Sequence, residues 1–173
     1  MALHLTILAL SAVAGASSSL LENFGSLGTG SYSSFSAFGG HATFSAYGAG
    51  SILADPGSLP PRSNPNAIFG NGAAVVITFD QTWNHITGYF RVPSFEMLAS
   101  SKRTISSNPT FAVVEFYRNG SQVGLSVYSI VKDDRYTIFD WDLAEEGGFD
   151  SMVILGNGGN GDLIGMDDMT VSS

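Results

Sequence analysis

The chain has 173 residues, seven basic and fifteen acidic side chains, a formal net charge of −8 and no cysteine. The lack of cysteine excludes disulfides, thiolate catalysis and cysteine-ligated zinc, and the acidic balance makes a nucleic acid an unfavourable partner. The length suits one domain with its own core. Many Gly (21) and Phe (12) residues with few charges favour packed strands joined by tight turns.

The N-terminal segment is predicted to be a signal peptide. Residues 1–16 form an apolar run without a charged side chain, and the run ends in the small-x-small pattern Ala14-Gly-Ala16. It is too short for a comfortable bilayer span. We therefore expect a secreted, extracellular protein with a single domain over residues 17–173; the alternative is a buried N-terminal strand or helix.

Nine strands are predicted from short apolar or alternating runs. Residues 48–72 are predicted to be a turn-rich connection and residues 93–109 to hold one helical turn. Many short strands with almost no helix predict an all-β antiparallel β-sandwich of the jelly-roll, galactose-binding-like kind. The predicted strands are 20–24, 42–47, 73–79, 85–92, 111–118, 122–131, 136–141, 151–155 and 163–171.

The clearest local signal is the pair Asn119-Gly120 between two β-rich runs. Asn-Gly is the preferred sequence of a two-residue type I′ turn, because both positions need a positive φ. A β-hairpin is predicted here.

Three acidic residues near the predicted strand 136–141 suggest an alternative, catalytic interpretation. Asp140 and Asp142 would share one face of a strand, with Glu145 just beyond it, which is similar to the carboxylate ladder of laminarinase-type glycosidases. Gly147-Gly148 breaks the strand soon after, which favours a connecting turn. The Gly/Asn-rich segment 156–162 is likewise interpreted as a flexible hairpin loop rather than a calcium repeat.

The last predicted strand places two adjacent carboxylates inside an apolar run. Strict alternation puts Asp167 on the face of Met169 and Val171, and Asp168 on the face of Met166. A buried carboxylate without partners is costly. A bound cation, a cluster of backbone amides or a local bulge could each satisfy it.

Aromatic side chains could provide platforms for sugar rings, since flat rings pack against the apolar faces of pyranoses. Trp83, followed by Asn84 and His85 at a turn between predicted strands, is the best candidate for a ligand-binding site. The competing interpretation is that the rings fill or cover the core. The aromatic candidates are Trp83, Trp141, Tyr47, Tyr89, Tyr128 and Tyr136.

A series of short motifs resembles the exported jelly-roll domains found on PEP-CTERM-sorted bacterial proteins, which are related in shape to carbohydrate-binding modules. The chain ends at Ser173 without the sorting motif of that family. The resemblance covers nearly all of residues 17–173. Its motifs are Leu21-Glu-Asn-Phe24, Asn64-Pro-Asn-Ala-Ile-Phe69, Val76-Ile-Thr-Phe-Asp80, Ile86-Thr-Gly-Tyr-Phe90, Val113-Val-Glu-Phe-Tyr117, Phe149-Asp-Ser-Met-Val153 and Gly165-Met-Asp-Asp-Met-Thr-Val171.

The resemblance implies a structural calcium ion (Ca2+) that joins the first strand to the last. Its ligands would be Glu22 or Asn23 near the start and Asp167 or Asp168 near the end, with backbone carbonyls added.

Together, these features predict a secreted, non-catalytic β-sandwich module, stabilised by calcium, that binds an extracellular polysaccharide or cell-surface glycan or acts in matrix adhesion. The alternatives are a structural extracellular protein that self-associates without a glycan site, and a small glycosidase or lyase built on Asp140, Asp142 and Glu145.

Overall fold

The computed structural model describes residues 18–54, 61–63, 66–91, 111–129, 136–156 and 164–173. The predicted signal peptide, the helical turn within 93–109 and the loop 157–162 lie outside these residues. No helix in the described part of the chain is long and apolar enough to cross a bilayer.

The described residues form two antiparallel sheets, which we call sheet A and sheet B. In sheet A the spatial order is β11-β8-β13-β6-β5-β2, and β1 also pairs with β13. Its strands are β1 (Ser19–Glu22), β2 (Gly30–Tyr32), β5 (Ser51–Ala54), β6 (Ile68–Asn71), β8 (His85–Arg91), β11 (Thr137–Asp142) and β13 (Gly165–Ser172).

In sheet B the spatial order is β10-β9-β12-β7-β4-β3. A short 3-10 turn (Phe38–Gly40) separates its first two strands in the chain. The strands are β3 (Ser34–Ala37), β4 (Ala42–Tyr47), β7 (Ala74–Trp83), β9 (Phe111–Arg118), β10 (Ser121–Ser129) and β12 (Phe149–Gly156).

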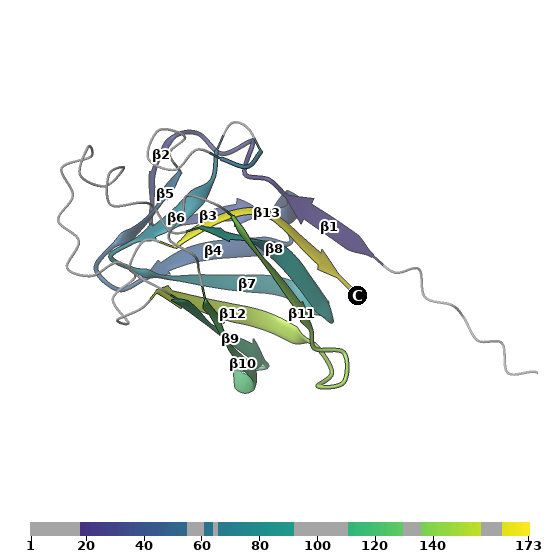
Figure 1. Cartoon of the computed structure of the whole chain (residues 1–173). Helices are drawn as coiled ribbons and strands as arrows, with labels where there is room; N and C mark the ends of the chain where they lie inside the picture. The colour runs from purple at the N-terminus through teal and green to yellow at the C-terminus, as the bar shows by residue number, and fades with distance from the viewer. Residues whose placement is uncertain (1–17, 55–60, 64–65, 92–110, 130–135, 157–163) are drawn as a thin grey trace, which may run out of the picture.

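The two sheets pack face to face as a β-sandwich, which confirms the predicted fold class (Figure 1). The chain passes repeatedly from one sheet to the other: β7 lies in sheet B, β8 in sheet A, β9 and β10 in sheet B and β11 in sheet A. β1 lies beside the C-terminal half of β13, so that the start and the end of the described chain meet at one end of the sandwich.

The core lies between the sheets and follows the period-two pattern of the strands. In β7, Val75, Ile77 and Phe79 are buried, whereas Thr78 and Asp80 between and after them are exposed. The core is rich in aromatic rings that meet edge to face, such as Phe116 with Phe149. It closes without disulfides because many large apolar side chains are fully removed from water.

In the described part of the chain all nine predicted strands are present, with ends that differ by up to four residues, and the prediction missed four strands: β2, β3, β5 and β6. The prediction that residues 48–72 are only a turn-rich connection is wrong in part, because this stretch contains β5 and β6. The missed strands have three or four residues each and are rich in Gly, Ser and Ala, so that they show little periodicity.

The predicted hairpin is confirmed. Asn119 and Gly120 join β9 to β10 with φ values of 50° and 77°, as a type I′ turn requires. The Asn119 N–H donates to the carboxylate of Asp150 (2.7 Å), which ties the turn to the start of β12.

Candidate functional site

A bulge in β13 decides where the two adjacent aspartates point. Between Asp167 and Thr170, β13 advances three residues while β8 advances two, from Tyr89 to Thr87, and Asp168 has a φ of 46°. Met166 before the bulge and Met169 after it therefore both face the core. The strict alternation predicted from the sequence is wrong at this point, because one extra residue changes the face of everything that follows.

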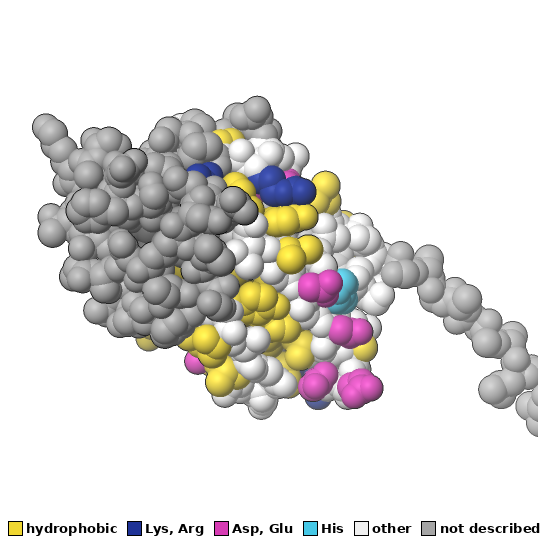
Figure 2. Space-filling model, in the orientation of Figure 1, with side chains coloured by type: hydrophobic (Ala, Val, Ile, Leu, Met, Phe, Trp, Pro, Cys, Tyr) yellow, Lys and Arg dark blue, Asp and Glu magenta, His cyan; other side chains and the backbone are white. Residues whose placement is uncertain are grey.

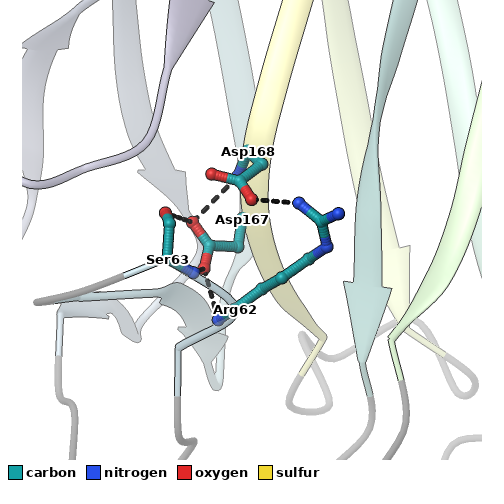
Figure 3. A network of polar contacts seen from close by, with 4 residues as sticks. All are labelled: Arg62, Ser63, Asp167 and Asp168. Atoms are coloured by element: carbon teal, nitrogen blue, oxygen red, sulfur yellow. Dashed lines mark hydrogen bonds and ion pairs between the residues drawn. The ribbon is translucent and has the colours of Figure 1, made fainter.

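Asp167 lies on the outer face of sheet A, opposite Tyr89, yet its side chain is fully buried. It is covered by Arg62 and Ser63, whose backbone N–H groups both donate to Oδ2, at 2.7 and 3.0 Å (Figure 3). Oδ1 accepts from the N–H of Asp168 (2.8 Å) and from the hydroxyl of Ser63 (3.3 Å). A cluster of amides and a bulge, two of the solutions expected for a buried carboxylate, thus act together.

The neighbouring Asp168 forms an ion pair with the guanidinium of Arg62. The same guanidinium lies over the ring of Tyr89, with Cζ 3.8 Å from the ring centre. We call Arg62, Ser63, Asp167 and Asp168 the β13 clasp. It fixes the segment 61–63 across the outer face of sheet A (Figure 3).

Glu22 at the end of β1 is also held by backbone amides. Its two carboxylate oxygens accept from the N–H groups of Phe24 and Phe38, both at 2.7 Å. Both phenylalanines have positive φ values, 56° and 52°, which bulky residues rarely adopt. Asn23 accepts from the N–H of Gly25 (3.0 Å). Glu22 therefore joins two turns that are separate in the sequence, one at Phe24 and one at Phe38.

These contacts do not fit the predicted calcium site. The pairing of β1 with β13 does bring the first and last strands together. However, both oxygens of Glu22 and both of Asp167 face N–H or O–H donors, whose hydrogens repel a cation, and Arg62 supplies the positive charge next to Asp168. Within the described residues, no group of three or more His, Asp or Glu side chains could hold a metal ion. Calcium binding stays a prediction.

Trp83 does not present its ring to solvent, which corrects the expectation that it forms a sugar platform. Only 1% of the residue is exposed. β7 continues to Trp83 before the chain crosses to sheet A, so that the ring enters the core opposite Phe149.

Asn84 and His85 remain near the surface. Asn84 bridges strands through its backbone, donating to Ser172 (3.0 Å) and accepting from Leu143 (2.7 Å). His85 Nε2 lies 2.7 Å from a carboxylate oxygen of Asp140. Their role in ligand binding stays a prediction.

Asp140 and Asp142 point from the same face of β11, as the period of the strand predicted, because Trp141 between them packs toward the core. Each is engaged locally: Asp140 pairs with His85, and Asp142 accepts from the N–H of Ala144 (2.9 Å) at the following turn. Figure 2 shows acidic side chains gathered beside a histidine on one open face of the molecule. The hydrogen bond to Asp142 is typical of a turn, and the contact between Asp140 and His85 is typical of a polar pair on a protein surface.

Four of the other aromatic candidates have side chains packed against their rings. Tyr89 lies beneath Arg62, and Tyr136 has the guanidinium of Arg91 5.3 Å from its ring centre. Tyr128 packs edge-on against Trp141, with ring centres 4.2 Å apart, on the core side. None of these four aromatic rings is a free platform for a sugar.

The outer face of sheet B is different. Four shallow cavities follow β7 along this face, with volumes of about 450, 350, 180 and 380 Å3. β7 spans from Ala74 at the first to Asp80 at the last, which is about 20 Å at the rise of an antiparallel strand. We call these four cavities together the β7 groove. Its lining includes the side chains of His41, Tyr47, Val76, Thr78, Asp80, Gln81, Glu115, Tyr117, Asp150, Val153 and Leu155.

One half of the β7 groove is aromatic and apolar. Tyr47, with 74% of its surface exposed, and Tyr117 flank a floor made by Val76 and Val153. The hydroxyl of Tyr117 donates to Glu115 (2.6 Å), and this hydrogen bond raises the pKa of Tyr117. Exposed rings beside fixed polar groups are the arrangement that binds the apolar and polar faces of a sugar together.

The other half of the groove is polar. Asp80 pairs with His41 (2.9 Å), and both remain about half exposed. Thr78, Gln81 and Asp150 complete the lining. This half offers hydrogen-bond acceptors and donors where the first half offers apolar contact.

Tyr117 and Glu115 were not among the candidate residues from the sequence, although a signal was present. In β9 every second residue is apolar and buried, so Val113, Glu115 and Tyr117 had to share the outer face. What the strand alone did not indicate was which face of which sheet stays open.

No protein-family model and no curated protein sequence matches this chain. Among solved structures it is similar to a variant of a family 29 carbohydrate-binding module at 14% identity, with 91% of each chain covered and a TM-score of 0.46. Two further variants of that module, in complexes with mannohexaose and with cellulohexaose, match at 12% and 14% identity with TM-scores of 0.44 and 0.43; they cover 91% of this chain and 92% and 90% of their own.

Proposed function

We propose that this protein is a non-catalytic carbohydrate-binding β-sandwich that holds a glycan in the β7 groove. The observation that carries the proposal is Tyr47, a largely exposed ring that borders the apolar cavity with Tyr117 and Glu115. The ring would stack on a sugar, and the carboxylate and hydroxyl groups along β7 would bind sugar hydroxyls. Export through residues 1–16 would place this activity outside the cell, on a polysaccharide or a cell-surface glycan.

Retention of the chain on a panel of soluble neutral polysaccharides in affinity gel electrophoresis tests this proposal. Tyr47→Ala should weaken retention at least tenfold, whereas Tyr47→Phe, which keeps the stacking ring, should retain it. Ile138→Ala is the matched control, because Ile138 is a large side chain with 56% exposure on sheet A, away from the groove. Equal retention of Tyr47→Ala and the native chain would contradict the proposal.

A second candidate is a structural protein that self-associates. Leu125 and Val127 are 61% and 60% exposed on β10, the edge strand of sheet B, where unpaired backbone groups can pair with a second copy. Sedimentation velocity over a concentration series tests it. Association that a Leu125→Lys/Val127→Lys variant abolishes, without retention on any glycan, would favour this function.

A further inference from the structure

The lining of the β7 groove carries negative charge and no permanent positive charge. Three carboxylates, Asp80, Glu115 and Asp150, lie along it. Among the described residues that line its four cavities none is Lys or Arg, and the one titratable base, His41, is paired with Asp80.

The carboxylates are fixed rather than free to turn away. Glu115 accepts from Tyr117 (2.6 Å), Asp80 is held by His41 (2.9 Å), and Asp150 accepts from Asn119 (2.7 Å). A carboxylate that is held in place keeps its charge directed at whatever occupies the groove.

We infer that the β7 groove accepts neutral glycans and rejects glycans that carry carboxylate or sulfate groups; this inference rests on the proposed function. The hydroxyls of a neutral glycan can donate to Asp80 and Glu115 in charge-assisted hydrogen bonds. An acidic group on the ligand meets like charge, with no guanidinium or ammonium in the described lining to compensate it. Selectivity thus comes from an attraction and a repulsion at the same side chains.

The test compares each of two polysaccharides with its own carboxymethylated form: hydroxyethyl cellulose with carboxymethyl cellulose, and galactomannan with carboxymethyl galactomannan. The native chain should bind a carboxymethylated form at least tenfold more weakly than its neutral parent in low salt, and the gap should narrow in high salt because like-charge repulsion is screened. An Asp80→Asn/Glu115→Gln variant should regain binding to the carboxymethylated form.

Glu145→Gln/Glu146→Gln is the matched control. Both residues are exposed at the turn between β11 and β12, outside the groove. The control variant removes two negative charges, the same number as the Asp80→Asn/Glu115→Gln variant. It should keep the native discrimination, which separates the local charge of the groove from the net charge of the protein.

The possible outcomes distinguish a failure of the charge selectivity from a failure of the proposed glycan binding. Equal or stronger binding of a carboxymethylated form by the native chain, or recovery by the Glu145→Gln/Glu146→Gln control, overturns the inference and leaves the proposed function standing. Retention on none of the four polymers, nor on the wider neutral panel, overturns the proposed function and the inference with it.

Discussion

At the scale of single residues, Glu22 is the clearest case of a side chain that holds the backbone. It accepts from the amides of Phe24 and Phe38, which both have left-handed backbone conformations and buried rings. Such conformations persist only where the surroundings enforce them. The Glu22 carboxylate is one of the groups that enforce them.

Glu22→Ala should lower the free energy of unfolding by about 2 kcal/mol or more, because two amides at least partly shielded from water lose their acceptor. Urea unfolding followed by fluorescence measures it. Glu145→Ala, an exposed carboxylate at a turn, should change stability by no more than about 0.5 kcal/mol. Equal effects of the two substitutions would contradict this role of Glu22.

Asp167 should make stability depend on pH in the opposite sense to a salt-bridged aspartate. Burial raises its pKa above the ordinary value, and the hydrogen bonds from the amides of Ser63, Asp168 and Arg62 offset only part of that rise. Between the ordinary and the raised pKa, the folded state binds more protons than the unfolded state. The contribution of this group to stability therefore increases as pH falls through the folded pKa, and is lost as pH rises through it.

The measurement is the free energy of unfolding of the native chain and of Asp167→Asn from pH 7 down to about pH 4. As pH falls, the free energy of unfolding of the native chain should rise relative to that of Asp167→Asn, because the variant has no titrating group at this position. A constant difference, or one that moves the other way, would contradict the assignment.

At the scale of elements, β8 and β11 fit together through a glycine. Gly88 lies opposite Phe139 in the ladder, and a Cβ atom on Gly88 would lie 2.5 Å from the Phe139 ring. The glycine makes room for the fully buried ring of Phe139, which β11, an outermost strand of sheet A, directs into the core.

Gly88→Ala should therefore destabilise the fold by about 1–3 kcal/mol, the usual cost of forcing extra volume into a packed core. Gly30→Ala is the control, because the atoms nearest to a Cβ atom at Gly30 in the edge strand β2 belong to the side chain of Tyr32 and lie at ordinary contact distances, 3.6 Å or more. Thermal unfolding of both variants compares them. Similar melting temperatures of the two variants would contradict this role of Gly88, because β8 and β11 would then accommodate the added methyl group without a loss of stability.

At the scale of the whole molecule, the first and last strands of the described chain are joined by hydrogen bonds between protein groups. β1 pairs with β13, and Ser18 and Ser173 bond beyond them. The β13 clasp then ties the segment 61–63 to the same strand. We expect the melting temperature to be the same in EDTA and in millimolar calcium. A rise with calcium that Asp167→Ala/Asp168→Ala removes would instead support the site predicted from the sequence.

The sequence by itself determined the fold class, nine of the strands and the Asn119-Gly120 hairpin, because alternation and turn chemistry are local. It also predicted that the carboxylate pair of β13 needs partners. Only the tertiary structure decided what those partners are, because Arg62 and Ser63 lie more than a hundred residues away in the chain. The bulge at Asp168 reversed the faces, and Trp83 is buried because β7 continues to this residue within sheet B before the chain crosses to sheet A. Which sheet keeps an open aromatic face depends on how the layers pack, and no single strand carries that information.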